Sequence, residues 1–222
     1  MNFPNFQNEI EVWSKGFKAV GVDEVGRGCL AGPVVAAAVV LPVNFDKIFL
    51  NNQFHNCIIN DSKKLSRKQR EDCYNYIIEV ADSVETAIVD PSIIDKINIL
   101  QASILAMNLA IKKLKETNLS LLIDGNYFRT DLNLPFKTII HGDAISFSIA
   151  AASIIAKVTR DNFVSEYLHH LHPNYGFNKH FGYATKQHFI AIDKFGITIE
   201  HRKSFLIKYF QRKSKIEQVT LF

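Results

Sequence analysis

The sequence predicts an α/β fold: a β-sheet flanked by helices, followed by a helical extension at the C-terminus. Two observations support this prediction. Short apolar segments rich in β-branched residues alternate with longer segments in which apolar residues recur at helical spacing. The 222 residues are 47% hydrophobic and 22% charged, and they contain no repeat or low-complexity stretch. That composition supports a sizeable core and excludes collagen-like, disordered and disulfide-scaffold proteins.

The first part of the chain is expected to form mainly strands. Residues 17–24 are apolar and β-branched, and residues 33–41, rich in Val and Ala, are apolar on both faces, as in a buried strand. A short strand is also expected over 57–59. Ser66 is a typical helix N-cap, and the apolar residues that follow it predict a helix over 66–81.

The middle of the chain alternates between strands and helices. Residues 84–89 are strand-like, and Pro91 favours the start of a short helix. Residues 98–115 repeat apolar side chains at helical spacing and therefore predict a longer helix. Two more strands are expected, over 119–123 and 136–140.

Helices and one loop make up the rest of the chain. A helix rich in small residues, which allow close packing, is expected over 145–168. Residues 174–183 are rich in glycine and aromatic residues and predict a loop, whereas 185–195 predict a further helix. From Ser204 onward the sequence predicts a basic helical tail.

Charge and cysteines give weaker indications. A net charge of +4 permits a polyanionic partner without requiring one. Cys29, Cys57 and Cys73 are odd in number and lack the spacing of a zinc site or a disulfide framework, which favours a reducing compartment, the cytoplasm. Because the apolar run over 29–43 is shorter than the roughly 20 residues of a spanning helix, we expect no membrane span and no export signal. The scattered histidines, His188 among them, are assigned no catalytic role.

Carboxylates follow three of the predicted strands. Asp23 and Glu24 end the first strand, whereas Asp124 and Asp143 follow the last two. In an open α/β sheet, ligands bind beyond the carboxyl ends of the strands. If the three strands are neighbours, the four carboxylates meet in one place, where they need raised pKa values or a bound cation. An all-oxygen ligand set favours Mg²⁺ or Mn²⁺, and two such ions are the arrangement found in nucleases and polymerases.

Two points keep this interpretation open. Acidic residues after strands are often turn formers or helix N-caps, so any one of them is more often structural than catalytic. Consecutive side chains of a regular strand also point to opposite faces, so Asp23 and Glu24 reach one site only if the strand ends or bulges there. Gly26, Arg27 and Gly28 follow directly and let the backbone approach a ligand closely, although a plain turn explains them equally well.

Taken together, the ordered motifs resemble those of the ribonuclease HII family. The resemblance extends from about residue 17 to residue 205. It rests on the following blocks: 23–28 (DEVGRG), 31–37 (AGPVVAA), 60–65 (NDSKKL), 122–126 (LIDGN), 142–143 (GD), 151–161 (AASIIAKVTRD), 175–177 (YGF), 182–185 (GYAT) and 201–205 (HRKSF). So many blocks in the same order are very unusual for unrelated chains.

The resemblance implies an RNase H-like fold with a mixed sheet. It implies a hydrolase that cleaves the RNA strand of RNA–DNA hybrids and incises 5′ of single ribonucleotides in DNA, as in ribonucleotide excision repair. It also implies that the catalytic residues are Asp23, Glu24, Asp124 and Asp143, and that they bind two Mg²⁺ or Mn²⁺ ions. The products of such a reaction carry 5′-phosphate and 3′-hydroxyl ends.

The resemblance assigns substrate contacts to the glycine-rich turn and to a tyrosine. Gly26, Arg27 and Gly28 match the loop that recognises the ribose 2′-hydroxyl, the group that distinguishes RNA from DNA. Tyr183 matches a tyrosine that stacks at the RNA–DNA junction. The alternative for Tyr183 is a core aromatic residue in a glycine-rich loop.

Cations near the predicted site are candidates for phosphate contacts. Ser62, Lys63 and Lys64 fit a phosphate-contacting loop by the same resemblance, because two lysines can neutralise backbone phosphates and a serine can donate to them. A solvated loop ahead of a helix is the alternative, above all for Lys64. Lys157 is expected to support the site electrostatically and to contact substrate.

The end of the chain suggests a protein partner. The last five residues, with Gln218, Leu221 and Phe222, resemble the short peptide with which bacterial replication proteins bind the sliding clamp, although an ordinary helix end explains them as well. We expect a cytoplasmic monomer with an N-terminal segment, a catalytic domain that includes a helical cap, and a basic tail. These parts are residues 1–16, 17–205 and 206–222.

Two alternatives remain at this point. A ribonuclease HIII-like enzyme shares the strand-end acids, but its recognition loop differs from Gly-Arg-Gly and it has an N-terminal substrate-binding domain, whereas this chain is expected to begin its core almost at once. A non-catalytic module that binds hybrids keeps the fold and the basic surface. Its idle carboxylates, however, cost stability through mutual repulsion.

Overall fold

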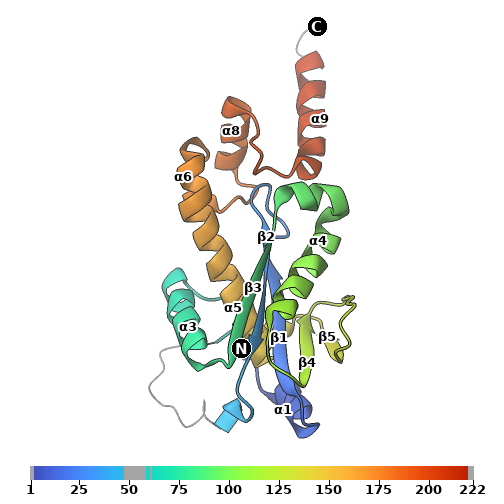
Figure 1. The fold of residues 1–222 in the computed structure, drawn as a ribbon. Coiled ribbons are helices and arrows are strands. Elements are labelled where there is room, and N and C mark those ends of the chain that lie inside the picture. The colour runs from blue at the N-terminus through green and yellow to red at the C-terminus, as the bar shows by residue number, and fades with distance from the viewer. Residues whose placement is uncertain (1–2, 48–58, 61, 220–222) are drawn as a thin grey trace.

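The protein's structure, a computed structural model, describes residues 3–47, 59–60 and 62–219. Its centre is a five-stranded sheet in the order β3-β2-β1-β4-β5 (Figure 1). The strands are β1 (Lys18–Val25), β2 (Val34–Val40), β3 (Ser83–Val89), β4 (Leu119–Asp124) and β5 (Phe136–Ile139). β2 is antiparallel to both β1 and β3, whereas β1, β4 and β5 run parallel. The predicted mixed-sheet α/β fold is therefore confirmed.

Helices cover both faces of this sheet. The longer ones are α1 (Gln7–Ser14), α3 (Arg67–Val80), α4 (Pro91–Lys113), α5 (Phe147–Asn162), α8 (Lys186–Phe195) and α9 (Lys203–Val219). α4 lies on one face, and α3 and α5 lie on the other (Figure 1). α8 and α9 lie beyond one end of the sheet and form the predicted C-terminal extension.

Most of the predicted elements are present. The strands expected over 17–24, 33–41, 84–89, 119–123 and 136–140 correspond to β1 through β5. The short strand expected over 57–59 lies mostly outside the described residues, and Ile59 belongs to no strand. Residues 174–183, predicted as a loop, instead contain the helix α7 (Phe177–His180), because the buried Phe177 anchors a helical turn there.

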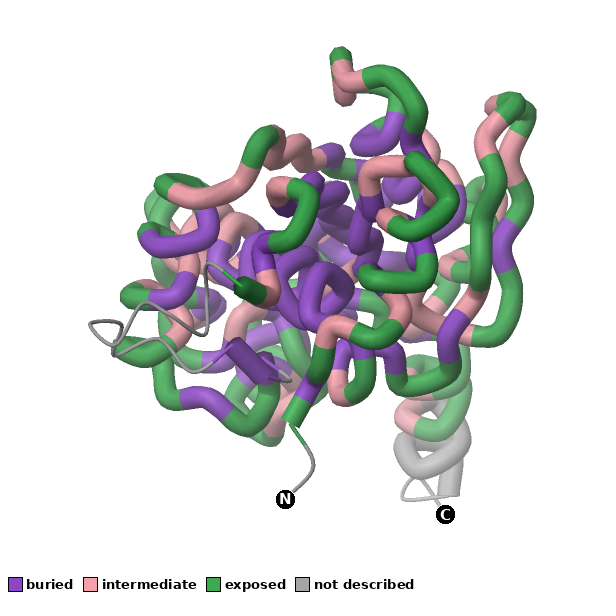
Figure 2. The backbone as a smooth tube through the Cα atoms, turned by 90° about the horizontal axis from the view of Figure 1, so that it is seen from below, coloured by how far each residue is buried: buried purple, intermediate pink, exposed green. Residues whose placement is uncertain are grey.

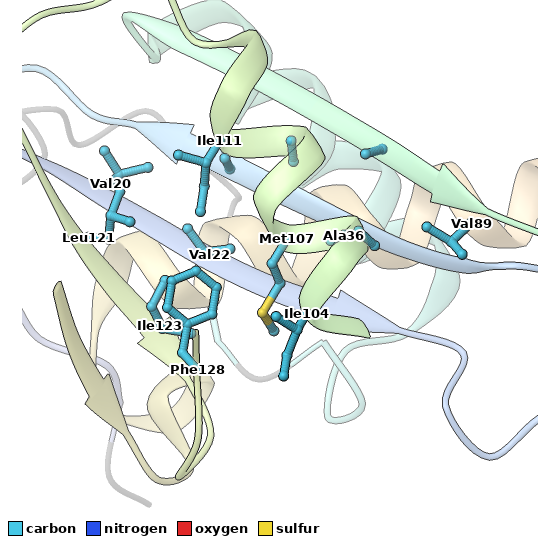
Figure 3. Packing of buried hydrophobic residues seen from close by; sticks show 14 of the residues in the cluster. Val20, Val22, Ala36, Val89, Ile104, Met107, Ile111, Leu121, Ile123 and Phe128 are labelled. Carbon is cyan, nitrogen blue, oxygen red and sulfur yellow. The ribbon is translucent and has the colours of Figure 1, made fainter. Parts of the chain in front are cut away.

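The position of β2 in the core explains why all of its residues are apolar. Every residue of β2 is buried, because helices cover both of its faces. Ala36 belongs to the cluster on the α4 side, and Val39 belongs to the cluster formed with α3 and α5. On the α4 side, Met107 and Ile111 project from the helix toward Val22 and the neighbouring strand residues (Figure 3). Buried residues accordingly concentrate at the centre of the molecule (Figure 2).

Two helix boundaries follow from single polar side chains. Ser66 caps α3 as predicted: its hydroxyl accepts from the Gln69 N–H, while the Gln69 side chain accepts from the Ser66 N–H. The short helix predicted to start at Pro91 and the longer one predicted over 98–115 form one element, α4, interrupted at Asn98, whose φ is 65°. The Asn98 carboxamide accepts from two following N–H groups at 3.0 and 3.2 Å, so it caps the second part of the helix from within.

α4 is long and apolar enough to span a membrane by length and composition alone. Its structural surroundings identify it as a core helix. Ala102, Met107, Ala110 and Ile111 are buried against the sheet. The left-handed backbone at Asn98 also divides the helix.

α1 is an element that the sequence did not reveal. It packs near the start of α5 through Glu9, which is fully buried. The Glu9 carboxylate accepts from the Ser146 hydroxyl at 2.5 Å and from the Ser148 N–H and hydroxyl at 2.9 and 2.7 Å. Because Ser146 is the N-cap of α5, α1 braces the beginning of the helix that packs on β1.

The cysteines differ from the expectation. Cys29 is a buried thiol outside any disulfide. Cys73, also buried, is disulfide-bonded. A single bridge is not a disulfide framework, but the cysteines no longer support the inference of a reducing compartment.

Candidate active site

The carboxyl ends of β1, β4 and β5 meet at one edge of the sheet. Val22 pairs with Ile123, so Asp23 and Asp124 come next on neighbouring parallel strands. Asp124 itself pairs with Ile139 at the end of β5, and the 3₁₀ turn η1 (Gly142–Ala144), which contains Asp143, follows shortly. The three strands are therefore neighbours, which was the condition for their carboxylates to meet.

A cavity of about 660 Å³ opens at this edge, and we call it the carboxylate cavity. It is lined by Asp23, Glu24, Val25, Gly26, Arg27, Gly28, Ser62, Lys63, Arg70, Asp124, Ser153, Lys157 and Tyr183. Asp143 is not among the lining residues. It lies next to the cavity, because the N–H of its neighbour Gly142 donates to Asp124 Oδ1 at 2.7 Å and because Lys63 Nζ is 4.0 Å from Asp143 Oδ2.

Burial and mutual repulsion act on these carboxyl groups. Burial raises the pKa of Asp23 well above its usual value, and the neighbouring charges of Glu24 and Asp124 raise it further. Burial also raises the pKa of Glu24, although the adjacent Arg27 partly offsets this. Burial and mutual repulsion therefore disfavour the charged form of both groups, and a cation bound at this point would lower both pKa values.

Asp23 and Glu24 share the cavity without a bulge. β1 pairs regularly with β2 through Val25, so the expectation of a strand that ends or bulges at the two acids is wrong on that side. On the other side, the pairing of β1 with β4 stops at Val22. Beyond that point none of the strands in the described residues pairs with this edge of β1, which leaves room for both carboxylates to line one cavity.

The glycine-rich turn after β1 forms one wall of the cavity. Gly26 has φ +96°, a backbone conformation that side chains rarely adopt, and a Cβ there would lie 2.3 Å from Arg160 Nε. Arg27 extends back to the sheet edge that carries the carboxylates, where its Nη1 donates to Glu24 Oε1 at 3.1 Å. The turn predicted from Gly26, Arg27 and Gly28 is thus coupled directly to one of the carboxylates.

The predicted phosphate loop reaches the cavity only in part. Ser62 and Lys63 line it, whereas Lys64 is exposed and does not. Sequence reasoning missed Arg70, whose guanidinium donates to the Ser62 carbonyl at 2.9 Å and to the Leu65 carbonyl. The signal available in the sequence was the position of Arg70 one turn into the helix that Ser66 caps. A side chain there can reach back to the loop that contains Ser62 and Lys63.

Ser153 is a second residue without a predicted role. Its hydroxyl donates to Asp23 and lies 3.0 Å from the Ser62 hydroxyl. α5 therefore supplies a hydrogen-bond donor to the buried Asp23 carboxylate. The small residues around Ser153 allow α5 to lie this close to the sheet.

The far wall of the cavity contains Tyr183 and Lys157. Tyr183 is 36% exposed and lines the cavity, so it is not a core aromatic residue. Lys157 Nζ lies 5.3 Å from the centre of its ring and donates to Asp161 at 2.9 Å. This ion pair between residues four apart on α5 holds a cation beside an exposed aromatic ring.

Three histidines that are scattered in the sequence cluster behind Tyr183, and two of them, His188 and His201, share a hydrogen bond. His188 Nδ1 donates to the Tyr183 carbonyl at 2.9 Å, so its Nε2 is free to accept from His201 Nε2 at 3.1 Å. His201 Nδ1 accepts from the Thr198 N–H at 3.0 Å. His180 completes the group: its Nε2 donates to a carbonyl, and its Nδ1 accepts from the Gly182 N–H. These partners require all three imidazoles to be neutral.

Stability is expected to fall in mild acid because of this histidine cluster. Burial lowers the pKa of His188 to about 4 and that of His201 to about 3, below the ordinary 6.5. Unfolding restores the ordinary value, so the unfolded chain binds more protons below pH 6.5, and stability is complete above that pH. Each histidine then costs up to about 1.4 kcal/mol per pH unit as the pH falls toward its folded pKa.

Urea unfolding of the wild type and of the double variant His188→Gln, His201→Asn measures this effect. Between about pH 6.5 and pH 5 the wild type is expected to lose up to about 4 kcal/mol of its unfolding free energy through these two histidines, whereas the double variant has a flatter profile. The other histidines are retained in both proteins and serve as the internal control. Equal slopes in the two proteins would contradict the argument.

The carboxylates suit a hard divalent cation. Their donor set is entirely oxygen, which Mg²⁺ and Mn²⁺ prefer. Among the described residues no group of three or more His, Cys, Asp or Glu side chains is arranged so that it could hold a metal ion by itself. Mg²⁺ commonly binds through one or two carboxylates, keeps waters and takes substrate phosphates as further ligands.

Comparison with known proteins agrees with this arrangement. The family model for ribonuclease HII matches residues 20–211. A ribonuclease HII of Chloroherpeton thalassium is 49% identical over 205 residues, which are 92% of this chain and 98% of that protein.

Solved structures show the same fold. The RNase HII in a complex with PCNA from Archaeoglobus fulgidus is similar with a TM-score of 0.67 and 24% identity, over 84% of this chain and 94% of that one. Bst-RNase HIII in complex with Mn²⁺ is similar with a TM-score of 0.57 and 20% identity, over 81% of this chain and 63% of that one.

The family model and the C. thalassium relative each cover most of the chain. The strand-end carboxylates and the glycine-rich turn that the structure gathers around one cavity lie within the matched residues. The chain belongs to the ribonuclease HII family, metal-dependent endonucleases with RNase H activity on RNA–DNA hybrids.

Proposed function

We propose that this chain incises duplex DNA 5′ of single embedded ribonucleotides, in addition to cleaving the RNA strand of RNA–DNA hybrids. One observation supports the proposal above the others. The carboxylate cavity joins Asp23, Glu24 and Asp124 to the turn at Gly26 and Gly28, so a hydrolytic site and a backbone surface able to read a 2′-hydroxyl are adjacent.

Two divalent ions, Mg²⁺ or Mn²⁺, are the proposed cofactors, with Asp23, Glu24, Asp124 and Asp143 as the residues that hold them. When bound, such ions supply a nucleophilic water, orient the scissile phosphate and stabilise the leaving oxygen. The chain's own residues prepare that site. Ser153 fixes the Asp23 carboxylate, the Gly142 N–H fixes Asp124, and the buried position of Glu24 keeps its charge poorly screened by solvent.

The remaining cavity residues orient the nucleic acid in this proposal. Gly26, Arg27 and Gly28 offer backbone groups to the 2′-hydroxyl of the ribonucleotide. Tyr183 stacks at the junction between ribonucleotide and DNA, with Lys157 beside it. Ser62 and Lys63 contact a phosphate, and Lys64 contributes to the positive surface outside the cavity. The products carry 5′-phosphate and 3′-hydroxyl ends.

The experiment that tests this proposal is the cleavage of a labelled DNA duplex containing one ribonucleotide, with Mg²⁺, Mn²⁺ or EDTA. The expected result is one metal-dependent cut 5′ of the ribonucleotide, with no cut in the matching all-DNA duplex. An RNA–DNA hybrid run in parallel compares the two activities. If the protein binds the duplex but never cuts it with either ion, a non-catalytic hybrid-binding module becomes the better account.

We further propose a sliding clamp as a protein partner and the cytoplasm as the compartment, with the enzyme acting as a monomer. The proposal rests on the resemblance of the terminal residues, with Gln218, Leu221 and Phe222, to a clamp-binding peptide. Leu221 and Phe222 lie outside the described residues. The A. fulgidus relative was solved with a clamp, PCNA.

Deleting residues 218–222 is expected to abolish binding to an immobilised bacterial sliding clamp, because the peptide's apolar end supplies the contact. Cleavage of the single-ribonucleotide duplex without clamp is expected to stay at the wild-type rate. Surface plasmon resonance measures the first and a gel assay the second. Unchanged clamp affinity in the truncated protein removes the proposal.

A further inference from the structure

Two arginines outside the carboxylate cavity are completely buried. Arg160 lies on α5 and Arg202 lies in the link between α8 and α9, and both are 0% exposed. In the part of the chain that the structure describes, each side chain hydrogen-bonds only to backbone carbonyl oxygens, and neither is paired with a carboxylate. A buried guanidinium without a counter-ion is costly, so its acceptors indicate what it holds in place.

Arg160 connects residues 26–33, which include the glycine-rich turn, with the turn that contains Tyr183. Its Nε donates to the Pro33 carbonyl at 2.9 Å and its Nη2 to the Ala31 carbonyl at 3.1 Å. Its Nη1 donates to the Phe181 carbonyl at 3.0 Å, and the guanidinium lies 5.8 Å from the centre of the Tyr183 ring. The Arg160 side chain therefore links α5 to two segments: residues 26–33 and the turn before Tyr183.

Arg202 holds the same segment from the opposite side. Its Nε and Nη2 both donate to the Gly32 carbonyl, at 3.0 and 2.8 Å. Its Nη1 donates to the Arg27 carbonyl at 3.0 Å, which lies between the two glycines that border the cavity. The Arg202 N–H also donates to the Leu30 carbonyl at 2.8 Å, so backbone and side chain act together.

The backbone of the two walls is joined as well. The Leu30 N–H donates to the Gly182 carbonyl at 2.8 Å, one residue before Tyr183. At the other end of the segment, the Arg27 side chain donates to Glu24. Residues 26–33 are thus held between a catalytic carboxylate and the Tyr183 turn, and the two arginines supply most of the side-chain hydrogen bonds that hold them.

We propose that Arg160 and Arg202 are positioning residues that determine specificity for a ribonucleotide embedded in DNA. They hold residues 26–33 and Tyr183 at a fixed separation, so that backbone recognition of one 2′-hydroxyl and stacking at the neighbouring junction occur in the same substrate pose. The inference rests on the proposed function of the glycine-rich turn. Neither arginine touches substrate.

The proposal predicts a difference between two substrates. A duplex with one ribonucleotide offers a single 2′-hydroxyl. If the glycine-rich turn is displaced, it can no longer contact that hydroxyl while the scissile phosphate lies at the carboxylates. An RNA–DNA hybrid offers a 2′-hydroxyl at every RNA position, and a loosened turn still finds one near the scissile phosphate. Loss of an arginine therefore affects the first substrate more than the second.

Lysine is the informative replacement, because it keeps the charge but replaces a five-donor fork by one flexible ammonium. We expect Arg202→Lys and Arg160→Lys to lower kcat/KM on the single-ribonucleotide duplex about tenfold more than on the hybrid, since several charge-assisted hydrogen bonds are lost. Arg67→Lys is the matched control. Arg67 is an exposed arginine on α3 that pairs with Glu71, and its replacement is expected to change neither rate.

A second readout does not depend on activity. Amide hydrogen exchange followed by mass spectrometry is expected to be faster in residues 26–33 of both arginine variants, with β1, β4 and α5 unchanged. Faster exchange of that segment together with the substrate difference supports the inference. Unchanged exchange there, or equal losses on both substrates, overturns it. If the wild type cuts neither substrate, the proposed function fails, and the exchange data alone decide whether the arginines hold the segment.

Discussion

Replacing Asp124 by asparagine is expected to lower kcat on an RNA–DNA hybrid by at least about 1000-fold, which corresponds to about 4 kcal/mol of transition-state stabilisation. Asparagine keeps the shape of the side chain, and its amide oxygen can still accept from the Gly142 N–H at the place of Asp124 Oδ1. What it removes is a negative charge at the end of β4, in a site where charge holds the proposed ions. Single-turnover kinetics at saturating enzyme measures the loss.

The stability of the same variant distinguishes a catalytic charge from a structural one. The Asp124 charge raises the pKa values of Asp23 and Glu24, which shows that it repels them. Without metal, Asp124→Asn is therefore expected to unfold at the same or a higher urea concentration than the wild type. Asp82→Asn, which removes a partly exposed carboxylate paired with Lys18, serves as the control and is expected to keep full activity. A destabilised Asp124→Asn protein, or one that retains activity, contradicts this role.

Replacing Gly21 by alanine is expected to destabilise the protein by at least about 4 kcal/mol, a large part of the total stability of a typical domain. Gly21 lies in the middle of β1, and a Cβ there would be 2.0 Å from the Ser148 carbonyl carbon and 2.5 Å from the Ile149 nitrogen. Both atoms belong to the backbone of α5, so no side-chain rotation relieves the clash. α5 would have to move away from the sheet together with Ser153, the partner of Asp23.

Urea unfolding and the yield of folded protein measure the Gly21→Ala effect. Gly28→Ala is the matched control for stability, because nothing lies within 4 Å of the position of its Cβ and its backbone is not left-handed. Its free energy of unfolding is expected to stay within about 1 kcal/mol of the wild type. If Gly21→Ala unfolds at the wild-type urea concentration, the close packing of α5 on β1 is not required.

Much of the fold could be predicted because local pattern and tertiary packing agree. β2 is apolar throughout since both of its faces are buried, and α3 begins at Ser66 because that residue forms a capping box. α1 escaped prediction for a physical reason. Its fully buried residue is the polar Glu9, whose partners Ser146 and Ser148 are more than a hundred residues away in sequence.

The site residues that lie at strand ends could be predicted from the sequence. Those that only tertiary contacts bring to the site could not. Asp23 and Asp124 could be placed together because residues at the ends of neighbouring parallel strands must meet. The position of Arg70, one turn into the helix that Ser66 caps, was the one signal that it lines the cavity, and no pattern within the sequence indicated that His188 and His201 share a hydrogen bond. Those contacts join segments that have no local periodicity in common.

The most direct test of the account is to count the Mn²⁺ ions that the protein binds, by electron paramagnetic resonance, with a ribonucleotide-containing duplex whose scissile linkage cannot be hydrolysed. The proposed mechanism predicts about two ions per wild-type chain and a loss of at least one in the double variant Asp124→Asn, Asp143→Asn. No bound ion in the wild type, or the same number in both proteins, would contradict the assignment of the strand-end carboxylates as the metal site.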